Sequence, residues 1–408
     1  MKTSHVHVVG AGLAGLAAAL DLSDAGIPVT LYEAGPAAGG RCRSYFDREL
    51  GARLDNGNHL LLSGNRAAWR FLDRIGARAT MGGPARPIFP FMNVATGERW
   101  SVRPNAGKLP WWVLSRSRRV PATRARDYLA LLRLRRAGPD DTVGAILPPG
   151  PLRTSLLDPF AIAALNTRPD EGSAALLAAV IEESLSAGGR ACIPAFPREG
   201  LSESFIDPAV NALRQAGGVV RLSTRVAALG FSGDRVCALD GHALGQDEAI
   251  VLATPAPAAA SLIPGLTAPD RFESIVNVHF RVAADAGEAG FIGLVGGLAE
   301  WAFVKPGILS VTISAANHLA TTSTEAIAQQ CWGELATAFG LHEPMPPWRV
   351  LREKRATFIA TPAQDRRRPP ARTALRNLAL AGDWTATALP ATIEGAIRSG
   401  QTAAQLML

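Results

Sequence analysis

Closely spaced glycines near the start of the chain could hold a phosphate group. The short β-rich run Val6–Val9 is followed by Gly10, Gly12, Leu13, Ala14 and Gly15. Glycine permits a tight turn, close approach of the backbone to a pyrophosphate, and close packing of a helix on a strand. The Ala- and Leu-rich segment that follows is expected to be a helix to about Asp24, and its first turn offers unpaired N–H groups to an anion. The pattern therefore predicts a phosphate-binding loop.

A carboxylate stands at the end of the next expected strand. The β-rich run Val29–Tyr32 is followed by Glu33, which lies 18 residues beyond Gly15. A carboxylate at this distance can accept hydrogen bonds from ribose hydroxyl groups, and an acid there disfavours a 2′-phosphate. The first strand, the helix, the second strand and the acid follow one another in the order and spacing of a βαβ dinucleotide-binding unit, so the sequence predicts such a unit for FAD or NAD.

Later segments distinguish between the two cofactors. Gly39-Gly40-Arg41 resembles the FAD-binding amine oxidase and carotenoid desaturase superfamily, which implies that Gly40 and Arg41 contact FAD phosphates. The resemblance assigns further FAD contacts to Gly57, Asn58, Val226, Gly382, Asp383, Thr392 and Ile393. Among these, the backbone at Val226 is expected to pair with the adenine, and Asp383 to hold the ribityl chain or the pyrophosphate. The helix that opens near Thr392 would direct its N–H groups to the flavin O2/N1 edge, where negative charge grows on reduction.

Four segments resemble a narrower family, the hydroxysqualene dehydroxylases, also called squalene-associated FAD-dependent desaturases. They are Arg43–Asp47, Asp55–Ser63, Pro197–Glu203 and Ala381–Gly400. The similarity extends from about His5 to Ala404. It implies reductive removal of the allylic hydroxyl of hydroxysqualene, which gives squalene as a hopanoid precursor. A reduced flavin could deliver hydride to an allylic cation, so the protein need supply an apolar site, orientation, an acid and protection from water.

The sequence suggests three residues as the acid. His59 is the first candidate, because its motif is expected near the flavin and an imidazole titrates near neutrality. The competing interpretation is that His59 only packs or binds backbone. His279 and Glu300 are weaker candidates, since each stands in an apolar context typical of a hydrogen-bonded core group.

Other functions on the same fold stay open at this point. One is another FAD-dependent isoprenoid desaturase or an amine oxidase. Amine oxidases usually have a pair of aromatic residues by the flavin, whereas Trp384 is the only aromatic residue in positions 384–389. The other is a non-catalytic prenyl-lipid carrier, although such relatives have lost the flavin-binding residues that are retained here. The electron donor is also open, because no second GxGxxG motif indicates a nicotinamide site.

Positive charge is concentrated in one segment of the chain. Residues 103–136 contain ten Lys or Arg and one acid, whereas the whole chain has a net charge of +7. The same segment contains the apolar run Trp111–Leu114. Basic residues beside Trp and Leu suit an anionic membrane surface, and the alternative is a solvated face. Nucleic-acid binding is not expected, since no nucleic-acid fold signature accompanies the charge.

Composition and cysteine spacing limit the class of protein. The chain has 408 residues, of which 48% are hydrophobic, as in a globular protein. The four cysteines lie far apart, which predicts neither a disulfide framework nor a metal site. No signal peptide is evident, and the uncharged stretch Val251–Pro269 contains four prolines, so it is expected to be a buried strand and a turn. We therefore expect a cytoplasmic protein, with a peripheral position on the inner face of the cytoplasmic membrane if the basic segment binds lipid.

These observations predict an α/β protein. A discontinuous Rossmann-like FAD-binding domain is expected from residues 1–75, 195–265 and 370–408. Residues 76–194 and 266–369 are expected to form an inserted α+β domain for a hydrophobic isoprenoid substrate and for the membrane. Within it, Ala174–Ile181 has helical apolar spacing, and Phe291–Val295 and Trp301–Val304 are apolar strands.

Overall fold

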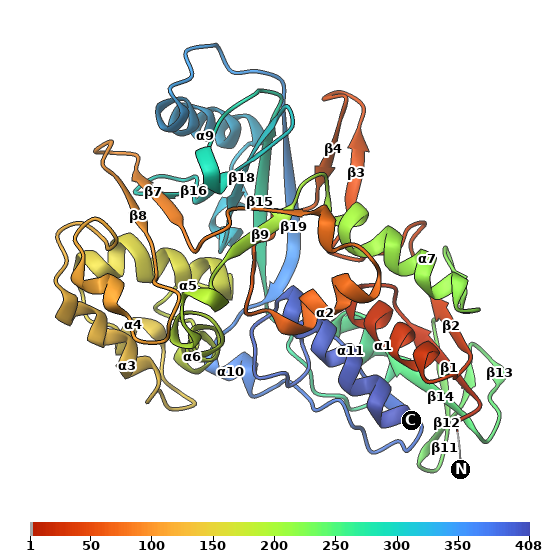
Figure 1. Cartoon of the computed structure of the whole chain (residues 1–408). Helices are drawn as coiled ribbons and strands as arrows, with labels where there is room; N and C mark the ends of the chain where they lie inside the picture. Colours follow the sequence, from red (N-terminus) through yellow and green to blue (C-terminus); the bar gives the residue numbers. More distant parts are fainter. Residues whose placement is uncertain (1–2) are drawn as a thin grey trace.

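A five-stranded parallel sheet takes its strands from distant parts of the chain. The computed structural model in Figure 1 describes residues 3–408. The strands are β1 (His5–Val9), β2 (Val29–Tyr32), β10 (Val219–Arg221), β14 (Glu248–Leu252) and β20 (Leu378–Leu380). Their order in the sheet is β10-β2-β1-β14-β20, and every neighbouring pair is parallel. The α/β fold class predicted from the sequence is confirmed.

Helices cover one face of this sheet. The cover consists of α1 (Leu13–Asp24), α2 (Arg66–Arg74), α7 (Asp207–Gln215) and α11 (Ile393–Met407). Helices α1 and α11 lie side by side although they come from opposite ends of the chain (Figure 1). The contact requires a glycine at position 400, because a Cβ atom there would lie only 2.1 Å from the carbonyl oxygen of Ala14. The contact therefore fixes how closely the last helix approaches the first.

Strands and a short helix cover the opposite face. They are β11 (Leu229–Ser232), β12 (Arg235–Leu239), β13 (His242–Ala243) and α8 (Ala256–Leu262). Val236 and Leu239 pack in one apolar cluster with Ile250, Leu252 and strand β20. The alternate residues of the same central strands pack against α1 and α11. The parallel sheet is thus buried on both faces, which explains its continuous apolar strands.

A second sheet of seven strands lies beside the first. Its strands, in order, are β19 (Trp348–Phe358), β15 (Phe272–Phe280), β18 (Ile308–Ile313), β17 (Trp301–Lys305), β16 (Phe291–Val295), β7 (Phe89–Asn93) and β8 (Arg99–Val102). All pairs are antiparallel except β16 with β7. Helix α9 (Thr324–Phe339) covers one face, packing against Val276, Val278 and Phe280 of β15. The intervening residues of β15 therefore point to the other face.

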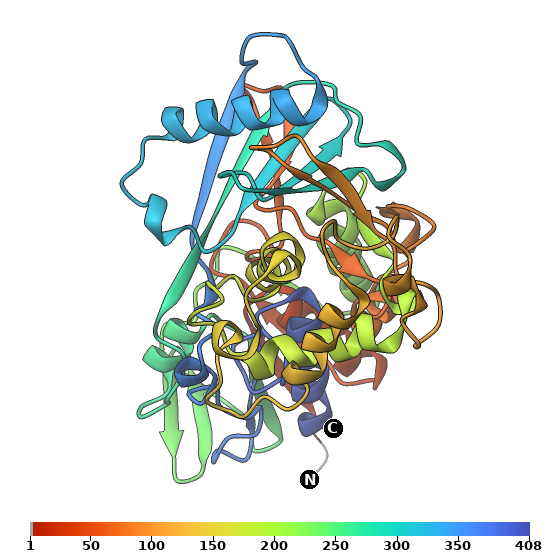
Figure 2. The same cartoon turned by 90° about the vertical axis from the view of Figure 1, so that its left-hand side faces the viewer.

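Short helices form a lobe beside this sheet. They are α3 (Ala130–Leu134), α4 (Val143–Ile146), α5 (Asp158–Leu165) and α6 (Ala174–Glu183). Figure 2 shows the lobe from the side, facing the viewer below α9. The remaining elements are the hairpin β3 (Ser44–Asp47) and β4 (Ala52–Asp55), the short strands β5 (Leu61–Leu62), β6 (Met81–Gly82) and β9 (Pro194–Pro197), and the helix α10 (Pro362–Asp365).

One local expectation from the sequence is wrong. The stretch Val251–Pro269 is a strand followed by helix α8 and not a turn, because Pro257 stands in the first turn of the helix, where a missing N–H costs nothing. Asp55 is the last residue of β4, and the residues that follow it as far as His59 form a bend. The predicted helix in Ala174–Ile181 and the strand Phe291–Val295 are confirmed.

Two wider features of the structure bear on the protein's environment. Within residues 3–408, no helix is both long and apolar enough to cross a membrane. The four cysteines are free, and Cys42, Cys192 and Cys331 are buried.

Substitution of Gly400 tests the contact between α1 and α11. Gly400→Ala is expected to lower the free energy of unfolding by about 2 kcal/mol, since the new methyl group meets backbone that cannot move aside easily. Gly333→Ala is the matched control, because Gly333 lies on the exposed side of α9 with nothing within 4 Å of a new Cβ. The control should be neutral or stabilising by up to about 1 kcal/mol. Thermal unfolding of both variants would show this, and equal midpoints would contradict the close contact.

Candidate active site

The parallel strands end together at one edge of the five-stranded sheet. Gly10 follows β1, Glu33 follows β2, Thr254 lies two residues beyond β14, and Gly382 lies two residues beyond β20. In open α/β sheets, ligands bind outside the carboxyl ends of the strands. The predicted contacts of the N-terminal and C-terminal segments therefore meet at one place.

Two glycine loops pack against each other at this edge. Gly10 has a φ of +109°, and a Cβ atom there would lie 2.6 Å from the carbonyl oxygen of Ala253. The backbone N–H of Gly39 donates to the carbonyl oxygen of Ala11 over 2.8 Å, and a Cβ on Gly40 would lie 3.5 Å from the Cα of Gly12. Side chains on either loop would separate the loops or fill the space between them.

The first turn of α1 is open to a ligand. Gly12 is the N-cap and contributes no side-chain hydrogen bond, and no atom lies within 4 Å of its missing Cβ. The N–H groups of Leu13 and Ala14 have no partner within the helix, as in any first turn. An anion placed here would accept from these groups and gain from the helix dipole.

Glu33 is fixed by the backbone around it. Its carboxylate accepts from the N–H of Ala11 over 3.0 Å and from the N–H of Gly35 over 2.8 Å. A carboxylate has about four acceptor positions, so lone pairs remain for ribose hydroxyl groups. The chain that continues from β10 runs alongside, since the N–H of Thr224 donates to the carbonyl oxygen of Glu33, and it leads to buried Val226. Val226 itself lies in an irregular segment and not in a strand.

Arg41 joins three distant parts of the chain. Its Nη2 donates to Asp383 over 2.7 Å, and its Nη1 donates to the carbonyl oxygen of Ala356 over 2.6 Å. Burial alone would lower the pKa of Arg41, but the Asp383 carboxylate outweighs it and raises the pKa above its usual value. Asp383 is 7% exposed and Arg41 is 41% exposed, so the arginine keeps surface that could contact a phosphate.

The loop before α11 places a second helix terminus at the same edge. Gly382 has a φ of +142°, and a Cβ there would collide with the indole of Trp384. Thr392 is the N-cap of α11, and its hydroxyl accepts from the N–H of Gly395 over 3.0 Å. That bond leaves the N–H groups of Ile393 and Glu394 without a partner in the helix.

The bend after β4 meets the face of the second sheet that lies opposite α9. Asn58 donates to the hydroxyl of Thr312 over 3.1 Å, and Thr312 donates to Asn277 over 2.8 Å. Asn277 in turn donates to the carbonyl oxygen of Asn56 over 3.1 Å. A Cβ on Gly57 would lie 3.3 Å from the Asn277 amide. This network holds Gly57 and Asn58 against strands β15 and β18.

Two buried polar atoms at the site lack a partner within residues 3–408. They are Oδ1 of Asn58 and Oγ1 of Thr254. Buried polar atoms in proteins are nearly always hydrogen-bonded, so each orphan indicates a place for a ligand or water. Together with the two open helix termini, the Glu33 carboxylate and the glycine loops, they fit FAD.

A buried ion pair beside the bend was missed from the sequence. Lys305 of β17 pairs with Asp55, and their side chains are 11% and 3% exposed. Asp55 also accepts from Ser44 Oγ over 2.6 Å and from the N–H of Leu201 over 2.8 Å. In the sequence, Asp55 stands out only as part of the segment Asp55–Ser63, and the only signal for Lys305 is a charge at the end of an apolar strand.

His59 is half-buried and lies near this ion pair. Burial lowers its pKa to about 4, while Asp55 acts in the opposite direction and Arg41 and Lys305 add to the lowering. The imidazole is therefore neutral at pH 7. It has no hydrogen bond to another residue in the described part of the chain, so both ring nitrogens are available.

The two weaker acid candidates have separate surroundings. His279 lies on the same face of β15 as Asn277, bonds Ser310 Oγ over 2.7 Å and is 1% exposed, and burial lowers its pKa to about 4. Glu300 precedes β17, and strand alternation places it with Ala302 on the α9 side. Burial raises its pKa to about 7, and it accepts from the N–H of Ser314 over 2.7 Å. Glu300 is thus separated by the sheet from the bend that carries His59.

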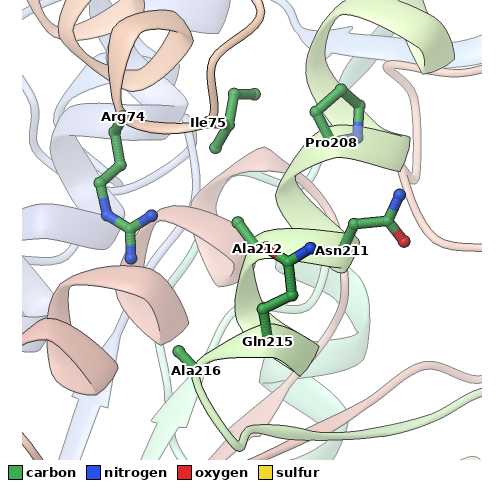
Figure 3. Close-up of a pocket in the computed structure, with 7 residues that line it drawn as sticks. All are labelled: Arg74, Ile75, Pro208, Asn211, Ala212, Gln215 and Ala216. Atoms are coloured by element: carbon green, nitrogen blue, oxygen red, sulfur yellow. The ribbon is translucent and has the colours of Figure 1, made fainter.

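A groove of about 500 Å³ lies elsewhere, between the end of α2 and helix α7 (Figure 3). Its lining is Arg74, Ile75, Pro208, Asn211, Ala212, Gln215 and Ala216. None of these residues belongs to the edge where the strands end, so the groove is separate from the candidate site.

Removal of the Arg41 charge tests the cofactor site. Arg41→Gln is expected to weaken FAD retention by about 10- to 100-fold, because the change leaves buried Asp383 unpaired and removes a charge-assisted contact. Arg48→Gln is the control, since Arg48 is exposed and forms no ion pair within residues 3–408. Flavin absorbance after gel filtration, with titration of apoprotein, measures the effect. If the two variants bound FAD with equal affinity, Arg41 would not be a cofactor-binding residue.

Comparison with known proteins identifies the family. The chain matches the family described as flavin containing amine oxidoreductase over residues 13–286 and 298–408. It is 48% identical to the hydroxysqualene dehydroxylase of Rhodopseudomonas palustris, over 99% of this chain and 98% of the relative. It is 47% identical to the enzyme of that name from Zymomonas mobilis, over 99% of both chains.

A solved structure shows the same fold. Cyclohexylamine oxidase from Brevibacterium oxydans superposes with a TM-score of 0.73 at 17% identity, over 99% of this chain and 98% of the oxidase. The chain is therefore an FAD-dependent flavoprotein, and it belongs to the hydroxysqualene dehydroxylase family within the flavin-containing amine oxidoreductases.

Proposed function

We propose that this protein catalyses the FAD-dependent reductive dehydroxylation of hydroxysqualene to squalene, as a step toward hopanoid precursors. The observation that carries the proposal is that the similarity to hydroxysqualene dehydroxylases covers nearly the whole chain. It therefore includes the substrate-facing sheet as well as the cofactor edge. We also propose that residues 1–75, 195–265 and 370–408 form the cofactor domain, and that the rest forms the substrate domain.

The face of the seven-stranded sheet opposite α9 suits an isoprenoid chain. Trp301 and Phe303 of β17 alternate with residues that pack on α9, so they share this face with Lys305. The Trp301 ring lies 5.4 Å from that of Phe91, and the Phe303 ring lies 5.8 Å from that of Phe291. This aromatic wall would bind a hydrocarbon and exclude water, and it adjoins the polar pair Asn277 and Thr312 through β18.

The reaction needs a proton and a hydride. Protonation of the hydroxyl oxygen lets the allylic C–O bond break with loss of water, and a hydride then closes the carbon centre. When bound, reduced FAD supplies that hydride and is oxidised. We assign the proton to His59, because it stands beside the aromatic and polar parts of this face with both ring nitrogens free. The neighbouring Asp55 carboxylate favours its protonated form.

The surroundings of Trp384 favour this reaction over amine oxidation. Trp384 is 3% exposed, and its Nε1 donates to the carbonyl oxygen of Thr254 over 2.9 Å. A ring fixed in this way is not available as one wall of an aromatic pair around an amine. We further propose that the enzyme works on the cytoplasmic face of a membrane, which it contacts through residues 103–136, because its substrate is a lipid.

A single-turnover assay tests the function. The FAD-loaded protein is reduced without excess reductant under anaerobic conditions and mixed with hydroxysqualene dispersed in detergent. One squalene should form for each FAD oxidised, as measured by mass spectrometry of the product and by flavin absorbance. Oxidation of amines together with unchanged hydroxysqualene would instead favour an amine oxidase. A colourless protein that takes up no added FAD would favour a lipid carrier.

The pH dependence of turnover tests His59. With a pKa of about 4, its protonated fraction rises about tenfold for each pH unit between pH 8 and pH 5. Single-turnover rates of the native protein should rise in the same direction as pH falls. His59→Gln should lower the rate by about 100-fold and flatten the profile. His279→Gln is the comparison, and a slope unchanged in the His59 variant would leave His59 with a packing role.

A further inference from the structure

Exposed apolar side chains are concentrated on one segment of the surface. Nine large hydrophobic residues are exposed in the described chain, and five of them are Leu109, Trp111, Leu114, Leu129 and Leu132. Leu109, Trp111 and Leu114 are each more than 60% exposed. Single exposed apolar residues are ordinary, but a cluster of this size usually marks an interaction site. We refer to residues 103–136 as the docking platform.

The platform is folded and holds these side chains outward. It contains two 3₁₀ turns, at Trp111–Leu114 and Ala125–Leu129, followed by α3. The turns pack on each other through Trp112 and Tyr128, whose rings lie 5.1 Å apart, edge to face. Asn105 accepts from the N–H of Trp112 over 3.1 Å and donates to the carbonyl oxygen of Leu109 over 2.9 Å. The exposure of Trp111 and Leu114 is therefore built into the backbone.

The basic residues of the platform divide into two groups. Arg118 and Arg119 brace the fold, since they donate to the carbonyl oxygens of Arg103 and Val113 over 2.9 and 2.8 Å. The exposed group consists of Arg103, Lys108, Arg116, Arg124, Arg126, Arg133, Arg135 and Arg136. Within residues 3–408, only Arg135 of the platform forms an ion pair, to Glu182 at 3.5 Å. So many like charges without counter-charges indicate an anionic partner.

We propose that the docking platform binds the surface of a bilayer that contains anionic lipids, with Trp111 and Leu114 inserted among the acyl chains. Basic residues attract anionic headgroups, while Trp and Leu gain from contact with hydrocarbon, which neither an acidic protein surface nor a nucleic acid offers in bulk. The platform belongs to the lobe of α3–α6, because Trp112 and Val113 pack in one apolar cluster with Leu177 of α6 (Figure 2). This proposal rests on the proposed function in one respect: binding to the membrane would bring the enzyme to its lipid substrate.

Vesicle binding by the FAD-loaded protein tests the proposal. Sedimentation is measured with phosphatidylcholine vesicles and with vesicles in which one lipid in four is phosphatidylglycerol, at low and high salt. The native protein should bind the anionic vesicles and be released by salt. A variant that lacks four of these charges should bind the anionic vesicles more weakly, by about fivefold for each charge removed. Its substitutions are Lys108→Gln, Arg116→Gln, Arg126→Gln and Arg133→Gln. Trp111→Ser with Leu114→Ser should weaken it by at least about tenfold.

Matched controls lie away from the platform. Phe231→Ser removes an exposed aromatic side chain of β11, and Arg214→Gln removes an exposed charge at the end of α7. Both should bind as the native protein does, and all variants should keep their FAD absorbance and their turnover of detergent-dispersed hydroxysqualene. Loss of that turnover in the native protein would defeat the proposed function without affecting the vesicle result. Salt-independent binding, or unchanged binding of the Trp111 and Leu114 variant, would overturn the proposal.

Discussion

The site depends on the ion pair between Arg41 and Asp383. These residues are 342 positions apart, and their pairing joins the second glycine loop to the end of the last strand of the parallel sheet. The same guanidinium donates to Ala356 of the second sheet. A buried carboxylate such as Asp383 is stable as an anion only when a charge or donors face it, so the loop and the strand cannot separate without a large cost. This side chain thus links the ligand edge of the parallel sheet to the second sheet, as the contacts of Asn277 and Lys305 with the bend after β4 also do.

The two faces of the seven-stranded sheet have different tasks. The face toward α9 is an ordinary apolar core, and it includes the turn that carries Glu300. The other face combines aromatic rings with Asn277, Thr312 and Lys305, which meet the bend after β4. Period-two alternation produces this division, since successive residues of a strand point to opposite sides. A hydrocarbon could therefore lie against rings while its polar end meets the hydrogen-bonding corner.

Electrostatics inside and outside the protein follow different rules here. Inside, Lys305 and Asp55 compensate each other, and His59 beside them stays neutral at pH 7 because burial lowers its pKa to about 4. On the docking platform, charges of one sign remain uncompensated because water solvates them at little cost until an anionic surface replaces the water. One chain thus combines a balanced interior with a strongly basic surface.

The sequence by itself determined the βαβ unit, because turn, helix and acid are contiguous and local chemistry suffices to specify them. Resemblance extended this to Arg41, Asp383 and Thr392, which the fold brings to one edge. The link between Asp55 and Lys305, and that between Asn58 and Thr312, could not be predicted, since each joins residues about 250 positions apart through strand register. The sequence also offered two acids in different contexts, His59 as the first candidate and Glu300 as a weaker one. Only tertiary structure placed them on different sides of a sheet, because the face on which a side chain lies depends on pairing between distant strands.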